Sequence, residues 1–238
     1  DPNVIRNTAV AEQCERFVDY VADRSDEDFT TVAMRFVRHT FRDHQRILFD
    51  GNGYSEEWEE EAARRGLPNL KSTPDALPAL IKPENIAFFQ KYGVLSDSEI
   101  HARYIAKAEQ YAKLLNIEAN TMVYMTRHMY LPALSNYSGD IAQTVATKDA
   151  IGIDAAGEKK LVQTLTDGIN SILADVDALE QKNAAVKAED DIQAEDDGYR
   201  DKVIPAMAKL RSDVDAMEKI CSHEYWPVPS YNKMLFYV

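Results

Sequence analysis

Apolar residues recur every three or four positions along most of the chain, which is the spacing of one face of an α-helix. The first two such faces consist of Val10, Cys14, Phe17 and Val21, and then of Phe29, Val32, Ala33, Phe36, Val37 and Phe41. No long run alternates between apolar and polar residues, as a half-buried strand would. The pattern therefore predicts an all-α fold built as a helical bundle.

The pattern is most regular in the last third of the chain. Two long stripes lie there: Leu161, Leu165, Ile169, Ile172, Val176 and Leu179, and then Ile204, Met207, Leu210, Val214, Met217 and Cys221. The acidic segment 188–198 separates them. Two long amphipathic helices joined by a polar turn pack antiparallel. We therefore expect a long antiparallel helical hairpin near the C-terminus.

Capping residues place several helix ends. We expect N-caps at Ser25, Ser55 and Thr73, a capping box formed by Ser96 and Glu99, and glycine stops at Gly66 and Gly93. Residues 47–49 are expected to form a short strand or an extended link. Pro132 interrupts an apolar helical run and is expected to kink or break it, because proline removes a backbone donor and crowds the preceding turn.

The segment ILFDGNGYSEEW, residues 47–58, has the order apolar run, glycine turn, helix that holds a dinucleotide in many enzymes. The fingerprint needs a third glycine where this chain has Glu56, and acids at the start of the following helix would repel a phosphate. The sequence favours a tight turn in which Gly51 and Gly53 take positive φ ahead of a capped helix.

The spacing of the residues also argues against a calcium-binding loop and against a histidine metal site. If Gly198 is aligned with the glycine of a calcium-binding EF-hand loop, Gln193 and Ile204 fall on ligand positions that they cannot fill, so the acidic segment is read as a solvated hairpin tip. The five histidines lack metal-ligand spacing; they are His39, His44, His101, His128 and His223. Cys14 and Cys221 are expected in the core. The sequence assigns no catalytic, cofactor-binding or metal-binding residue to this chain.

The charge and composition of the chain indicate which partners and which cellular location to expect. The 238 residues carry a formal net charge of −13, which would repel nucleic acid and anionic membranes, so neither is expected as a partner. Two cysteines suit a reducing compartment, and we expect a cytoplasmic location. No apolar run reaches membrane-spanning length and no signal peptide opens the sequence. The opening Asp1-Pro2-Asn3 reads as the middle of a protein, so we expect a fragment of a longer polypeptide.

Several segments together resemble type III glutamine synthetases. They are residues 46–58 (RILFDGNGYSEEW) with the following Glu61-Ala62 and Arg65-Gly66-Leu67, residues 69–78 (NLKSTPDALP), 98–104 (SEIHARY), 116–122 (NIEANTM) and 225–231 (YWPVPSY). Near the N-terminus, Pro2-Asn3 and residues 7–12 (NTAVAE) are similar to the segment that follows the last catalytic strand motif of that family. The matches follow the family's order over essentially the whole chain.

The resemblance implies that catalysis and support are carried by different parts of one longer polypeptide. These enzymes ligate ammonia to glutamate with ATP and a divalent metal such as Mg²⁺, using residues that precede this segment, so no catalytic residue carries over. Residues 1–66 would be the end of the catalytic domain, and residues 67–238 the helical C-terminal domain. The implied partners are the catalytic domain of the same polypeptide and further subunits, since the family assembles as stacked hexameric rings.

Two alternatives stay open from the residues themselves. One is a stand-alone helical interaction module without enzymatic activity. The other is a small-ligand binder in which Met122, Met125 and Met129 line an adaptable pocket, although ordinary core packing also explains them. The tyrosines are read as packing or interface residues (Tyr104, Tyr111, Tyr124, Tyr130 and Tyr137), and the aromatic tail 225–238 is expected to pack on its own fold or on a neighbour.

Overall fold

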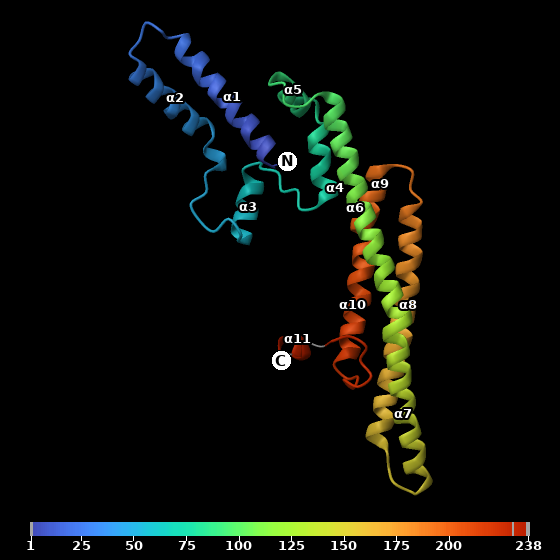
Figure 1. Cartoon of the computed structure of the whole chain (residues 1–238). Helices are drawn as coiled ribbons and strands as arrows, with labels where there is room; N and C mark the ends of the chain where they lie inside the picture. The colour runs from blue at the N-terminus through green and yellow to red at the C-terminus, as the bar shows by residue number, and fades with distance from the viewer. Residues whose placement is uncertain (1, 230, 237–238) are drawn as a thin grey trace. The chain divides into compact units, whose positions relative to one another are not determined.

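The computed structural model describes residues 2–229 and 231–236. The chain divides into two compact units, residues 1–105 and 106–238. Every regular element among the described residues is a helix or a helical turn, as Figure 1 shows, so the predicted all-α class is confirmed. None of the described helices combines the length and apolar character needed to span a lipid bilayer.

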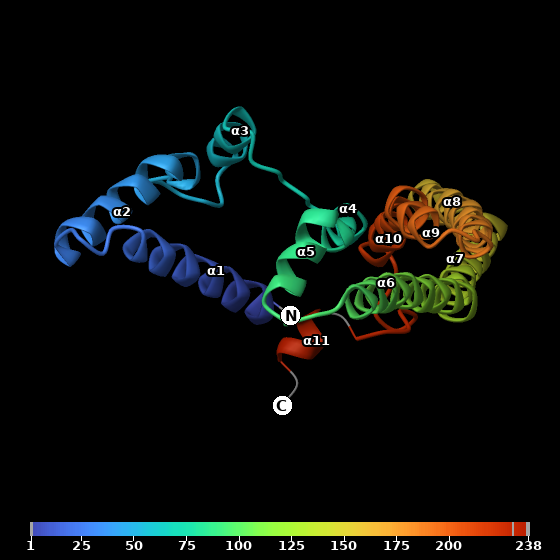
Figure 2. The same ribbon diagram turned by 90° about the horizontal axis from the view of Figure 1, so that it is seen from above.

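The first unit contains short and medium helices. They are α1 (Pro2–Ala22), α2 (Phe29–Asp43), the 3₁₀ turn η1 (Gln45–Ile47), α3 (Glu56–Arg64), α4 (Thr73–Ala76), the 3₁₀ turn η2 (Leu77–Ile81), α5 (Pro83–Lys91) and the beginning of α6 (Asp97–Met125). Helices α1 and α2 lie side by side as a hairpin in both views (Figures 1 and 2).

Aromatic side chains hold the α1–α2 hairpin together. The Phe17 ring meets the rings of Phe29 and Phe36 edge-on, with centroids 6.4 and 5.2 Å apart. Tyr20 packs on Phe36 at 5.4 Å. Edge-to-face pairs of this kind add roughly 0.5–1.5 kcal/mol each to the burial of apolar area. The hairpin therefore depends on a short row of rings.

Two of the expected N-caps shift along the chain. Asp28 rather than Ser25 caps α2, and its carboxylate accepts a hydrogen bond from the Thr31 backbone amide at 2.9 Å. Ser72 rather than Thr73 caps α4, because Thr73 is already helical and Pro74 follows it in the first turn. In both cases the residue immediately before the helix does the capping.

Ser55 stands just before α3, but its hydroxyl donates to the Asn52 carbonyl at 2.8 Å and caps no helix amide. The capping box and the two glycine stops are confirmed. The Ser96 hydroxyl accepts from the Glu99 amide at 3.3 Å, while Glu99 accepts from the Ser96 amide at 2.8 Å, so the capping box is complete. Gly66 and Gly93 take φ values of 69° and 61° just after α3 and α5. Residues 48–50 form an extended link after η1.

The second unit is built from three long helical segments. The chain runs along the later part of α6, the π-helical turn η3 (Thr126–Tyr130) and α7 (Leu131–Ala150). It returns along α8 (Ala156–Lys187), and runs back again through α9 (Ile192–Gly198), the π-helical turn η4 (Tyr199–Val203) and α10 (Ile204–Glu218). Helix α8 packs against both α7 and α10 (Figure 1), so the predicted antiparallel hairpin is confirmed. The short α11 (Tyr231–Leu235) follows.

The core of this unit centres on α8. Its apolar stripe is fully buried and consists of Leu165, Ile172, Val176, Leu179 and Val186. Leu134 of α7 and Leu210 of α10 reach the same cluster and are also fully buried. Each such side chain contributes roughly 1.5–3 kcal/mol through burial.

Pro132 neither ends nor interrupts the helical path, contrary to the expectation. It lies in the first turn of α7, directly after the π-helical turn η3. Pro205 stands in the same place after η4. Proline cannot donate to the carbonyl four residues earlier, and its ring crowds that carbonyl. A π turn bonds one residue further along and widens the helix, which relieves both problems.

The buried face that continues into α10 begins one residue earlier than the sequence pattern predicted. Ile204 was expected in the buried stripe, but it is exposed, whereas the neighbouring Val203 is fully buried. Seven residues, about two helical turns, separate Val203 from Leu210, so the two share one face, whereas Ile204 lies six residues before Leu210 and is turned about 120° away from it. The six-residue stripe read from the sequence is therefore displaced at its first member.

Polar side chains connect the long segments inside this unit. The buried amide Nδ2 of Asn183 donates to Oδ1 of Asn116 at 3.0 Å and to Oδ1 of Asn120 at 3.3 Å, which ties α8 to α6. Arg127 of η3 donates to Asp177 and Glu180 of α8, at 2.7 and 2.6 Å. Asn116 and Asn120 belong to the NIEANTM segment, so their spacing of four serves this contact.

The acidic segment is only partly a solvated tip. Asp191 caps α9, and α9 then packs on α8 closely enough to bury Asp196. Burial, followed by the charges of Glu195 and Asp197, raises the pKa of Asp196 from 3.8 to about 7. At Gly198, an added Cβ would lie 2.9 Å from a methyl group of Val186. The approach of α9 to α8 therefore requires a glycine here.

We expect Gly198→Ala to lower the free energy of unfolding by up to about 2 kcal/mol. The backbone of Gly198 is already helical, so alanine gains about 1 kcal/mol of helix propensity, but its methyl group overlaps buried Val186 at a cost of about 1–3 kcal/mol. The matched control is Gly139→Ala in α7, where an added Cβ meets nothing within 4 Å. That variant should be stabilised in urea unfolding; equal effects of the two substitutions would contradict the close approach.

We expect Asp196 to make the chain less stable as the pH rises. The unfolded chain releases this proton near pH 3.8, while the folded chain holds it to about pH 7, so stabilisation is complete below pH 3.8 and disappears as the pH passes 7. At about 1.36 kcal/mol per pKa unit, the loss is on the order of 4 kcal/mol at most.

Asp196→Asn should remove this loss, because the amide stays neutral at all pH values. Urea unfolding at about pH 5 and pH 8 should then give midpoints that lie closer together for the variant than for the unchanged chain, whose midpoint is lower at pH 8. Asp190→Asn, at an exposed position of the same tip, should behave like the unchanged chain. An undiminished pH dependence in Asp196→Asn would refute the assignment.

Candidate functional site

The glycine turn serves packing. Gly51 and Gly53 both lack positive φ, so that part of the expectation is wrong. A Cβ on Gly51 would lie 2.8 Å from the ring of Phe49, and this ring stacks on Trp58 with centroids 4.4 Å apart. Asn52 accepts from the Tyr54 amide at 3.1 Å and leads the chain into α3. Gly51 therefore makes room for an aromatic stack.

The histidines are scattered over the chain. The ring centroids of His39 and Tyr20 lie 6.3 Å apart, and those of His128 and Tyr124 lie 4.7 Å apart. His101 Nδ1 lies 3.0 Å from the carbonyl oxygen of Asp97 in its own helix. Within the part of the chain that the structure describes, no three His, Cys, Asp or Glu side chains gather where they could hold a metal ion.

The two cysteines have different surroundings. Cys221 is buried as expected, and burial raises the pKa of its thiol. Cys14 is exposed, so its predicted core position is wrong. It lies on a face of α1 that the described chain leaves uncovered, although the sequence spacing marks that face as apolar.

This uncovered face continues from α1 onto α2 and η1. We call it the apolar surface of α1 and α2; its members are the exposed Val10, Cys14, Phe41, Ile47 and Leu48, together with half-buried Phe17 at its edge. Two hollows lie on it and share Gln13 as a common wall. Phe41 is 61% exposed and Ile47 57%, values typical of polar surface residues. Contiguous apolar surface of this kind marks a site of interaction.

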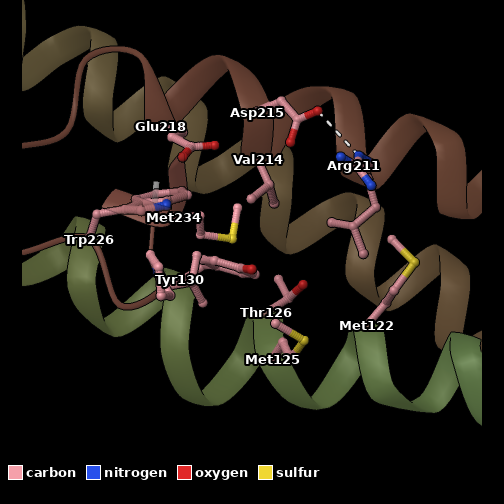
Figure 3. A pocket seen from close by; sticks show the side chains of 13 residues that line it. Met122, Met125, Thr126, Tyr130, Arg211, Val214, Asp215, Glu218, Trp226 and Met234 are labelled. Atoms are coloured by element: carbon pink, nitrogen blue, oxygen red, sulfur yellow. Dashed lines mark hydrogen bonds and ion pairs between the residues drawn. The ribbon is translucent and has the colours of Figure 1, made fainter. Parts of the chain in front are cut away.

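The second unit contains a cavity of about 340 Å³, shown in Figure 3. One wall comes from the end of α6 and from η3, with Met125, Thr126 and Tyr130. The opposite wall comes from α10, and Trp226 closes one end. Ligand-binding pockets in proteins commonly have about 300–1,000 Å³ of space, mostly apolar walls and a few polar groups. The cavity fits this description.

The α10 wall carries charge. Arg211, Asp215 and Glu218 follow one another at helical spacing, and Arg211 pairs with Asp215 at 3.3 Å. Burial, followed by the charges of Glu218 and Asp215, raises the pKa of the Tyr130 phenol across the cavity, while Arg211 opposes the shift. Both carboxylates therefore act on the space between the walls.

The segment after α10 completes the cavity. The Trp226 ring stacks on Tyr130 with centroids 5.1 Å apart, and Tyr225 packs on Tyr137 and donates a hydrogen bond to Asp140 of α7. This part of the aromatic tail packs on its own fold, as one of the two expectations had it. Met234, Leu235 and Phe236 are exposed, while residues 230, 237 and 238 lie outside the described residues.

The sequence predicted lining residues on only one wall of the cavity. Met122 and Met125 line it, as the ligand-binding alternative proposed, but Met129 is not among the lining residues. The α10 wall was missed, although Arg211, Asp215 and Glu218 repeat at spacings of four and three. The π turn at Thr126 was missed as well, and the proline that follows it was the available signal.

Residues 33–149 match the family model described as "Glutamine synthetase C-terminal domain". The chain therefore contains a glutamine synthetase C-terminal domain. The predicted resemblance to the C-terminal portion of type III glutamine synthetases is confirmed by this match and by the relatives below.

Similar proteins include a "Glutamine synthetase" of Butyrivibrio fibrisolvens, 31% identical over 89% of this chain and 31% of the relative. A "Type-3 glutamine synthetase" of Dictyostelium discoideum is 30% identical over 99% of this chain and 33% of the relative. A "Glutamine synthetase" of Bacteroides fragilis is 23% identical over 97% of this chain and 33% of the relative. The chain spans about a third of the length of these relatives, so two thirds of each lies outside the comparison.

The glutamine synthetase C-terminal domain family thus covers α2 to α7 of this chain. The matched range includes most of the α2 part of the apolar surface and the α6–η3 wall of the cavity. The α10 wall lies beyond it, in the part of the chain that the Dictyostelium discoideum and Bacteroides fragilis relatives still match.

Proposed function

We propose that this chain is the C-terminal helical region of a glutamine synthetase and that it supports the rest of that enzyme. The observation that carries the proposal is the exposed apolar surface of α1 and α2. In the proposal, this surface packs against the part of the parent polypeptide that corresponds to the unmatched two thirds of the relatives.

The energetics favour a covered surface. Burying a large apolar side chain gives roughly 1.5–3 kcal/mol, and six neighbouring side chains share this face. Monomeric proteins rarely leave contiguous apolar surface of this kind in water. The polar residues that line the two hollows are Arg6, Gln13, Thr40 and His44, and the row of acids on α3 lies outside both hollows.

The chemistry in this proposal belongs to the other part of the parent. Ligation of ammonia to glutamate, with ATP and Mg²⁺, takes place there, and no residue of this chain receives a catalytic, nucleotide-binding or metal-binding role. Residues 1–66 form the end of the catalytic domain and residues 67–238 the helical C-terminal domain. Association of several subunits into rings belongs to the same proposal.

We expect Phe41→Asp in the full-length parent to reduce glutamine synthesis at least about tenfold, because a charge in a dry contact costs several kcal/mol. Gel filtration should show loosened assembly in the same variant. Ile151→Asp is the matched control, since Ile151 is an equally exposed apolar residue in the α7–α8 connection. In the isolated chain both variants should keep the helical circular dichroism, because exposed substitutions are nearly neutral. Full activity and assembly of Phe41→Asp would overturn the proposal.

We also expect the 238-residue chain alone to release no phosphate from ATP in the presence of glutamate and ammonia. The control is the full-length parent, assayed at the same molar concentration. Turnover by the purified chain would place catalytic groups within it and contradict the division of labour. A parent reading frame without a glutamate-rich metal-binding barrel would instead favour the stand-alone interaction module.

A further inference from the structure

We propose that the cavity between α6, η3, α10 and Trp226 binds a small organic amine in its protonated form, with an apolar body and a neighbouring hydrogen-bond acceptor. The inference concerns the second unit alone and does not rest on the proposed function. Figure 3 shows the groups that carry it.

The charge of the cavity selects a cation. Two carboxylates, Asp215 and Glu218, stand on the α10 wall against a single guanidinium, Arg211. Arg211 is largely exposed and pairs with Asp215. Glu218 makes no ion pair with any described residue, so its charge remains available to the cavity. An ammonium group placed here gains a charge-assisted hydrogen bond, whereas an anion would be repelled.

The apolar walls select a body that carries the ammonium group. The stacked rings of Tyr130 and Trp226 offer π-surface, which attracts a cation within about 6 Å of a ring centroid. Met122 and Met125 lie on the α6 side, and methionine adapts its shape and contacts aromatic groups favourably. A cavity of about 340 Å³ has space for a one-ring molecule.

The indole of Trp226 selects the third feature of the ligand, which is its hydrogen-bond acceptor. Trp226 is 7% exposed and lines the cavity, and its Nε1 makes no hydrogen bond with a described residue. A buried donor without a partner costs roughly 1–3 kcal/mol. A carbonyl or hydroxyl oxygen beside the amine of the ligand would satisfy this donor.

Three matched probes test the inference. L-Phenylalaninamide has the amine, the ring and a carbonyl; 3-phenylpropanamide lacks only the amine; 2-phenylethylamine lacks only the carboxamide. Binding is measured near pH 6, where the amines are protonated, by the fluorescence of Trp226 in a Trp58→Phe background and by calorimetry. We expect phenylalaninamide to bind tightest and the neutral amide at least about tenfold weaker. We expect 2-phenylethylamine to bind between them.

Variants assign the contacts. Glu218→Gln should weaken phenylalaninamide about tenfold and leave 3-phenylpropanamide unchanged, because only the amine meets that carboxylate. Trp226→Phe, followed by calorimetry, should weaken phenylalaninamide and leave 2-phenylethylamine unchanged. Glu189→Gln, an exposed residue at the hairpin tip, should alter neither probe.

Two results would overturn the inference. One is equal affinity for the charged and neutral amides, which would leave only apolar binding. The other is no saturable binding of either amine up to about 10 mM, a limit weaker than about 3 kcal/mol of binding free energy. Thermal unfolding of Glu218→Gln and Trp226→Phe near pH 6 shows that each variant is folded under the binding conditions.

Discussion

The packing of α8 between α7 and α10 is the constraint on which the second unit depends. Its stripe of leucine, isoleucine and valine side chains is fully buried over most of a 32-residue helix. Truncating one such side chain typically costs 2–5 kcal/mol, so α8 fixes the helices on both of its sides. With these segments held, Tyr130 and Glu218 come to line one space although they are far apart in sequence.

The same packing explains why two prolines stand inside long helical paths. Arg127 and Arg200 occupy the second position of a five-residue π turn, and Pro132 and Pro205 follow each turn at the same distance. A break at either proline would separate residues that must all lie along α8. The widened turn keeps the path continuous and satisfies more of the backbone than a kink would. At η3, the turn also sets Thr126 and Tyr130 against the cavity.

The apolar periodicity and the capping residues predicted the helices and several of their ends, but they did not predict features that depend on tertiary packing. In the stripe that ends at Leu179, four of the six predicted members are fully buried and Leu161 and Ile169 are partly buried. Ser96, Glu99 and Gly66 act at helix ends as their chemistry requires. Ile204 was predicted to be buried because it lies three residues before Met207, but it is exposed, and fully buried Val203 shares the face of Leu210 instead. Asp196 misled because an acid in an acidic segment reads as solvated, and only the approach of α9 to α8 buries it. For the cavity, the α6 wall was predictable from its methionines, but the pairing of that wall with α10 depends on tertiary packing.

Exposed Phe41 and buried Leu179 come from the same kind of helical pattern. Periodicity establishes that a face favours burial, but it does not identify what covers that face. In the second unit the covering helices belong to the described chain, so the stripes disappear into the core. In the first unit the aromatic row around Phe17 covers only the inner side of the hairpin, and Cys14 and Phe41 stay outside it. An amphipathic helix stabilised mainly through its apolar face gains little from this arrangement alone. The uncovered face is therefore the part of the molecule whose sequence is best explained by a neighbour.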